Sequence, residues 1–174
     1  MTIGIKGVDE TIEEAKEYAA MGFKVFKVKT GLDVQEDIER IKGLYKSFGA
    51  DYTIRVDANQ GYDLPNLQQF LKATAGYPLE LIEQPLPVGQ EKALLTLSLT
   101  ERKTLTADEA LKDPLAALQF AAGDQPFGIY NIKLMKCGGI AGAREIGQIA
   151  RTSEINLFWG CNDESIISIT AALH

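Results

Sequence analysis

The chain has 174 residues, of which 45% are hydrophobic and 24% charged, and its net charge at pH 7 is −6. These values suit a globular domain with a substantial core, and the negative charge without any basic run argues against a nucleic-acid partner. No stretch approaches the roughly 18 continuous apolar residues of a membrane span, so we expect no membrane partner. With no signal-like start and only two cysteines, the sequence predicts a cytoplasmic protein.

Taken in order, the chain alternates short strand-like runs with segments of helical spacing. An apolar piece at residues 2–5 precedes a helical pattern at 9–21, which Gly22 ends. Residues 23–29 then alternate as a strand does. Further strands are predicted at 52–57, 79–83, 104–108, 129–133 and 155–160. Further helices are predicted at 34–48, 64–74, 91–99, 114–121, 141–151 and from 164 to the end.

This order of elements predicts the fold class. Strands that alternate with helices indicate an α/β protein with a parallel sheet. A run of such repeats without an evident reversal favours a (β/α) barrel over an open doubly wound sheet, and no Gly-x-Gly-x-x-Gly motif supports dinucleotide binding. A closed barrel needs eight strands and the pattern provides seven βα units. We therefore expect residues 1–174 to form a single, apparently truncated barrel domain whose eighth strand is missing.

Three consecutive predicted strands end in a carboxylate: Asp57, Glu83 and Asp108. The intervals of 26 and 25 residues are about what one strand, one crossover helix and two loops require. Parallel strands bring such ends to one edge of the sheet, where gathered carboxylates suit a hard divalent cation, and we predict Mg²⁺. The alternative, favoured for any single acid, is that each one caps a helix independently.

Lysines flank these acids along the chain, with Lys27 and Lys29 before them and Lys133 and Lys136 after them. A lysine inside a barrel is costly unless it is paired or functional. A bound divalent cation lowers the pKa of a neighbouring lysine, which makes it a usable general base. The plainer alternative is a set of structural salt bridges or side chains that reach out to the rim.

Five motifs occur in the order of these strands: Lys27-Val28-Lys29, Asp57-Ala58-Asn59, Glu83-Gln84-Pro85, Ala107-Asp108-Glu109 and the run from Asn131 to Gly139. Together they resemble the barrel motifs of the enolase superfamily, its muconate-lactonizing subgroup and, within that subgroup, the dipeptide epimerases. The resemblance implies that Mg²⁺ is held by the three carboxylates and binds the carboxylate of a small-molecule substrate. It also implies that Lys29 and Lys133 form an acid/base pair.

The same resemblance implies roles for further residues. Lys27 would stabilise the enediolate, Asn59 would support the site, and Glu109 would contact Lys133. The turn from Trp159 to Ser165 is similar to the Cys-x-x-Glu-Ser turn of dipeptide epimerases. The substrate-binding residues that we expect in this turn are Cys161, Asp163 and Glu164.

Two bases on opposite faces of a carbon allow a proton to leave one face and return to the other, which inverts a stereocentre. A metal at the neighbouring carboxylate offsets the charge that develops. The resemblance therefore favours epimerisation of a dipeptide, of the L-Ala-D/L-Glu type. The alternatives are a lyase or cycloisomerase of the same subgroup, such as an o-succinylbenzoate synthase or muconate cycloisomerase, and a catalytically silent barrel fragment.

The sequence departs from the family in two places. Family members carry an N-terminal capping domain, and dipeptide epimerases carry an Asp-x-Asp on the eighth strand that binds the substrate ammonium. We find neither in these residues. An open strand edge presents unpaired backbone groups and apolar surface, so we expect a homo-oligomer.

Overall fold

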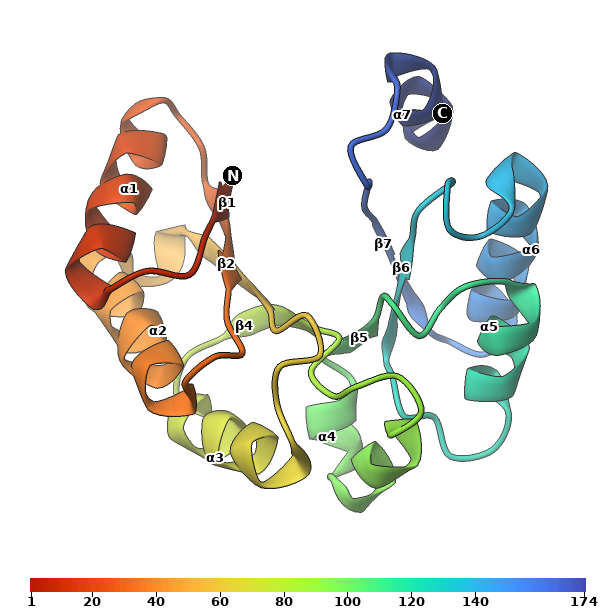
Figure 1. The fold of residues 1–174 in the computed structure, drawn as a ribbon, viewed down its shortest axis with the longest axis horizontal. Helices are drawn as coiled ribbons and strands as arrows, with labels where there is room; N and C mark the ends of the chain where they lie inside the picture. The colour runs from red at the N-terminus through yellow and green to blue at the C-terminus, as the bar shows by residue number, and fades with distance from the viewer. The chain divides into compact units, whose positions relative to one another are not determined.

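The computed structural model describes all 174 residues and divides them into two compact units, an N-terminal unit of residues 1–90 and a C-terminal unit of residues 91–174 (Figure 1). Each unit consists of parallel strands with helices beside them. None of the helices is both long enough and apolar enough to cross a membrane.

The N-terminal unit contains four strands that pair in chain order and run parallel. They are β1 (Thr2–Ile3), β2 (Val25–Lys29), β3 (Thr53–Asp57) and β4 (Leu79–Glu83). The connecting helices are α1 (Val8–Ala20), α2 (Val34–Phe48), the 3₁₀ turn η1 (Gly49–Asp51) and α3 (Leu64–Thr74). Helix α2 packs against both α1 and α3, and Figure 1 shows these helices beside the strands of this unit.

Two helices of this unit, α2 and α3, begin at acidic caps. The Asp33 side chain accepts the N–H groups of Gln35 and Glu36 at the start of α2, and Asp63 accepts that of Asn66 at the start of α3. Such caps satisfy backbone donors that have no partner within the helix. Gly49 follows α2 at a φ of 64°, a conformation that glycine adopts without a Cβ penalty. The sequence pattern thus fixes where these helices begin and where α2 ends.

The core of the N-terminal unit lies between the strands and the helices. Phe26 and Val28 of β2 are fully buried, and the Phe26 ring contacts Phe48 at the end of α2. Helix α2 buries Ile38 and Ile41 on the same side. Because side chains alternate along a strand, the residues of β2 between these apolar ones must face away from the helices.

The C-terminal unit contains three parallel strands in chain order. They are β5 (Leu105–Ala107), β6 (Ile129–Ile132) and β7 (Asn156–Trp159). Its helices are the 3₁₀ segment η2 (Glu91–Thr96), α4 (Leu99–Arg102), α5 (Pro114–Ala121), α6 (Gly139–Thr152) and α7 (Ile166–Leu173). Helices α5 and α6 pack together, whereas α7 contains no buried residue.

The prediction of an α/β fold with parallel strands in chain order is confirmed within each unit. The closed barrel with a missing eighth strand stays a prediction. The single helix predicted at residues 91–99 is wrong. Ser98 caps the next N-terminus by accepting the N–H of Glu101, which separates η2 from the short helix α4.

Candidate active site at the strand ends

The face of β2 that is turned away from the helices carries Lys27 and Lys29. In the parallel pairing of β2 with β3, Lys27 lies opposite Arg55 and Lys29 lies opposite Asp57. Their side chains are 21% and 33% exposed, while the intervening Val28 is completely buried. The alternation predicted from the sequence therefore places both lysines on the polar face of the sheet.

An irregularity between β3 and β4 brings two carboxylates together. Ile54 pairs with Leu79, but the next pair is Arg55 with Leu81, so Glu80 is an extra residue on β4. If the pairing continued without this shift of register, Asp57 would lie opposite Ile82. With it, Asp57 lies opposite Glu83, and both carboxylates are on the same face of the sheet.

One ammonium group lies between these two acids. Lys27 Nζ is 2.8 Å from Asp57 Oδ2 and 2.6 Å from Glu83 Oε2, and both carboxylates are buried. Burial lowers the pKa of Lys27, but the negative charges of Glu83 and Asp57 outweigh it, and the net pKa is raised above the usual lysine value. The two acids therefore hold Lys27 as a cation.

Lys29 binds the end of β3 and the loop that follows. Its Nζ donates to Asp57 Oδ2 at 2.8 Å and to Asn59 Oδ1 at 2.6 Å. The backbone N–H of Asn59 donates in turn to Asp57 Oδ1 at 3.1 Å, and Asn59 has a φ of 42°. This left-handed conformation suits asparagine better than most residues. The structure thus brings together all five residues predicted for the N-terminal unit: Lys27, Lys29, Asp57, Asn59 and Glu83.

In the C-terminal unit, a single acid binds two lysines. Asp108 Oδ2 is 2.5 Å from Lys133 Nζ, and Asp108 Oδ1 is 2.6 Å from Lys136 Nζ. Lys136 also donates to the carbonyl oxygen of Asn131 at 3.1 Å. Asp108 is 2% exposed, so this ion pairing takes place largely out of water. The structure therefore joins the predicted residues Asp108 and Lys133 and adds Lys136 to them.

Gly160, which directly follows β7, leaves room for the Lys133 side chain. A Cβ atom at this position would lie 2.6 Å from Asn131 Oδ1 and 3.0 Å from Lys133 Cε. Any other residue would press against the side chain that we expect to carry a proton. The sequence analysis did not single out Gly160, because a lone glycine at a strand end is also typical of an ordinary turn.

The remaining predicted residues lie in the C-terminal unit. Glu109 is half-buried next to Asp108. Glu164 is half-buried and accepts a hydrogen bond from the Ser168 hydroxyl at the start of α7. Cys161 and Asp163 are exposed, and the Cys161 thiol is free. Their roles toward a substrate, and a contact of Glu109 with Lys133, stay predictions.

The residues present fit a divalent cation in their chemistry. Asp57 and Glu83 already hold a cationic group between two carboxylate oxygens, and oxygen ligands are those that Mg²⁺ prefers. Neither unit by itself brings three acidic, histidine or cysteine side chains together. A three-carboxylate site with Asp108 as its third member draws on both units of the chain and stays a proposal.

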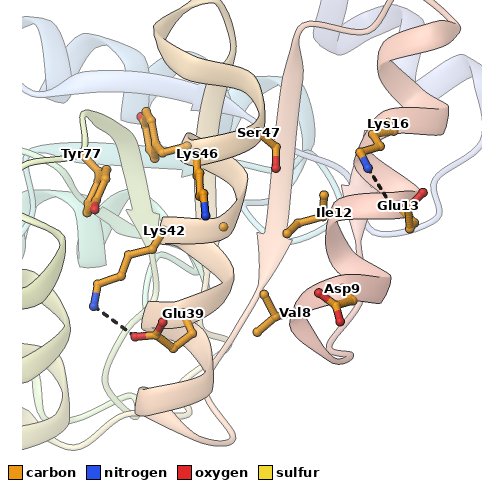
Figure 2. A pocket seen from close by; sticks show the side chains of 12 residues that line it. Val8, Asp9, Ile12, Glu13, Lys16, Glu39, Lys42, Lys46, Ser47 and Tyr77 are labelled. Carbon is orange, nitrogen blue, oxygen red and sulfur yellow. Dashed lines mark hydrogen bonds and ion pairs between the residues drawn. The ribbon is translucent and has the colours of Figure 1, made fainter.

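A separate groove of about 940 Å³ lies on the helical side of the N-terminal unit, between α1 and α2. Figure 2 shows Val8 and Ile12 on its α1 wall, and Lys42 and Lys46 on its α2 wall. Two of its charged pairs satisfy each other within their own helices, Lys16 with Glu13 and Lys42 with Glu39. None of the predicted site residues lines this groove.

The geometry defines an α/β protein whose charged side chains gather at the carboxyl ends of parallel strands, where such folds carry their active sites. Residues 10–174 match the family described as Enolase C-terminal domain-like, and the chain belongs to that family. The resemblance stated from the five motifs is therefore confirmed.

Relatives named as epimerases match the whole chain. An L-Lys-D/L-Arg epimerase of Desulforapulum autotrophicum is 50% identical over 174 residues, and one of Methylococcus capsulatus is 47% identical over the same length. The crystal structure of the dipeptide epimerase from M. capsulatus complexed with Mg ion superposes with a TM-score of 0.95 over 99% of this chain and 50% of that one. The chain spans about half the length of the curated relatives that it matches.

The sequence analysis also missed a buried polar cluster beneath Lys29. Asp37, Arg40 and Tyr62 are 0%, 1% and 3% exposed. The sequence does contain a signal for this cluster, because Asp37 and Arg40 lie at helical spacing on the buried face of α2. The apolar residues of that face are Ile38, Ile41 and Leu44. Two opposite charges on an apolar helix face indicate a buried ion pair.

Proposed function

We propose that this chain takes part in the Mg²⁺-dependent removal and return of the proton next to a substrate carboxylate, and that the result is epimerisation of a dipeptide. The observation that carries the proposal is the arrangement at the ends of β2, β3 and β4. There, Asp57 and Glu83 share one cationic group, and Lys29 lies beside them. The named activities of the relatives support it, since they are dipeptide epimerases.

In this proposal Asp57, Glu83 and Asp108 hold the metal. When bound, Mg²⁺ would offset the negative charge that grows on the substrate carboxylate as the proton leaves. Lys27 Nζ, which lies between Asp57 and Glu83, would add an ammonium beside the oxygens of the substrate carboxylate. Related dipeptide epimerases have been crystallised with Mg, which supports this choice of metal.

The proton is proposed to move at two lysine Nζ atoms. The neutral amine of Lys29 takes the proton from the α-carbon, whose C–H electron pair passes into the adjoining carboxylate. The ammonium of Lys133 then returns a proton to the opposite face, which inverts the centre and leaves the charge balanced. In the resting arrangement Asp57 and Asn59 orient Lys29, and Asp108 orients Lys133. General acid–base catalysis requires such fixed donors and acceptors.

For the substrate we propose a cationic dipeptide of the Lys/Arg type. The two relatives named L-Lys-D/L-Arg epimerase are 50% and 47% identical to this chain, whereas two named L-Ala-D/L-Glu epimerase are 30% and 32% identical. The net charge of −6 favours the approach of a cation. This choice replaces the L-Ala-D/L-Glu type expected from the sequence.

The test is solvent deuterium exchange with the purified chain, Mg²⁺ and three dipeptides, L-Lys-L-Arg, L-Ala-L-Glu and L-Leu-L-Tyr. Mass spectrometry measures deuterium at the α-carbon, and chiral chromatography identifies the epimer. We expect exchange and epimer formation with L-Lys-L-Arg, both abolished by EDTA. Exchange with a different product would indicate a lyase or cycloisomerase. No exchange with any dipeptide would contradict the proposed function of this chain.

A further inference from the structure

A buried ion pair in α2 binds the backbone on both sides of Thr30, directly after the proposed base Lys29. The Asp37 carboxylate pairs with the guanidinium of Arg40 and accepts the backbone N–H of Gly31 at 2.9 Å. Arg40 also donates to the carbonyl oxygen of Lys29 at 3.2 Å. One carbonyl and one N–H of this loop are therefore fixed by one charged pair.

The same carboxylate reaches the loop that follows β3. Tyr62 donates its hydroxyl to Asp37 Oδ2 at 2.7 Å, and its backbone N–H donates to the carbonyl of Pro85, after β4, at 3.0 Å. The loops also touch directly, because a Cβ on Gly61 would lie 2.3 Å from the Gly31 carbonyl oxygen. The segments after β2, β3 and β4 are thus bonded together around Asp37.

Packing alone does not require charged side chains in this cluster. A buried ion pair is seldom more stable than apolar side chains of the same volume, because removing two charges from water is costly. Here the pair directs its hydrogen bonds to the main chain beside a functional lysine. Burial raises the pKa of the Tyr62 phenol well above its usual value, so its hydroxyl remains a donor at ordinary pH.

We propose that Asp37, Arg40 and Tyr62 are positioning residues for Lys29. They hold the backbone around Thr30 so that Lys29 Nζ stays on Asp57 and Asn59. The significance for catalysis rests on the proposed function, in which Lys29 moves the proton. That the cluster keeps Lys29 Nζ on Asp57 and Asn59 does not rest on the proposed function, because these contacts can be measured with no metal and no substrate added. Lys27 provides the internal comparison, since it lies two residues upstream and its main chain is held by β1 and β3 on either side.

The experiment measures how fast each lysine is acetylated by a small amine-reactive ester, with no metal and no substrate, using peptide mass spectrometry. Tyr62→Phe removes one bond to Asp37 and keeps the ring that packs on Phe70. We expect the Lys29-to-Lys27 rate ratio to rise about threefold, since loss of one hydrogen bond loosens Lys29 from its acceptors. Arg40→Lys keeps the charge, loses the bond to Lys29 and should raise the ratio likewise.

The matched control is Tyr130→Phe. Tyr130 is a fully buried tyrosine of the C-terminal unit whose hydroxyl donates to one backbone carbonyl, that of Ala117. Its removal should leave the ratio at the parent value. A purely structural role for the cluster would loosen both lysines together and leave the ratio unchanged in Tyr62→Phe and Arg40→Lys. That result, or an equal rise in Tyr130→Phe, would overturn the proposal, whatever the deuterium exchange of the chain proves to be.

Discussion

The N-terminal and C-terminal units hold their strand-end charges in opposite ways. In the N-terminal unit, the acids Asp57 and Glu83 share the ammonium of Lys27. In the C-terminal unit, the acid Asp108 alone binds the ammonium groups of both Lys133 and Lys136. The first arrangement is suited to receiving a cation and the second to presenting ammonium groups. From this contrast we expect metal affinity to depend mainly on Asp57 and Glu83.

The two units also differ in how deeply the apolar side chains of their strands are buried. The helix-facing side chains of β2 and β3, such as Phe26 and Val56, are completely buried. On β7, by contrast, Leu157 is 42% exposed and Trp159 is 44% exposed. Burial of apolar surface contributes roughly 25 cal/mol per Å². Substitutions on β2 and β3 should therefore cost far more stability than those on β7.

The largest expected effect is on metal binding. Asp57→Asn or Glu83→Gln should weaken Mg²⁺ binding about 100-fold or more, because each removes an anionic oxygen ligand. Isothermal titration calorimetry of the chain measures this change. Asp51→Asn, which alters an exposed acid in η1, is the control and should bind as the parent does. Unchanged affinity in both site variants would show that the metal binds elsewhere.

A smaller effect is expected on stability. Phe26→Ala should cost about 3–5 kcal/mol, because it leaves a cavity between β2 and α2. Leu157→Ala should cost less than about 1 kcal/mol, since much of that side chain already contacts water. Urea denaturation followed by circular dichroism gives both values. Equal losses of unfolding free energy in the two variants would mean that β7 is covered in solution. The stated difference in burial between the strands would then be mistaken.

The smallest effect concerns Glu14 on the outer surface of α1. Hydrogen bonds from Lys6 and then from Tyr18 lower the pKa of Glu14 below its usual range. A lowered folded-state pKa contributes stability above the unfolded pKa, and this is lost as the pH falls through the folded value. Glu14→Gln should thus lower the melting temperature slightly at pH 7, and this difference should shrink as the pH falls below the usual glutamate pKa of about 4.3. A difference that grew toward acid pH would contradict this assignment.

Much of the fold could be predicted because local signals agree with it. The predicted ranges 34–48, 64–74, 79–83 and 114–121 coincide with α2, α3, β4 and α5. Acidic caps and a change from helical spacing to alternation mark these boundaries. The segment at 91–99 could not be predicted in the same way, since a capping serine inside an apolar run is also compatible with one continuous helix.

The candidate site was predictable in its residue types and less so in its geometry. The strand-end positions of Asp57 and Glu83 follow from sequence spacing. Their direct opposition depends on the shift of register at Glu80, because a change of register by one residue reverses the face of every side chain. The space that Gly160 leaves for Lys133 likewise depends on tertiary contacts, which no local pattern encodes.

The central claim is that proton transfer is divided between Lys29 and Lys133. It is tested most directly by deuterium uptake from the two epimers, L-Lys-L-Arg and L-Lys-D-Arg, with the purified chain and Mg²⁺. We predict that Lys29→Ala stops uptake from one epimer and Lys133→Ala from the other, while Lys112→Ala, an exposed control, affects neither. If either site variant exchanged both epimers at the parent rate, the two-base account would be wrong.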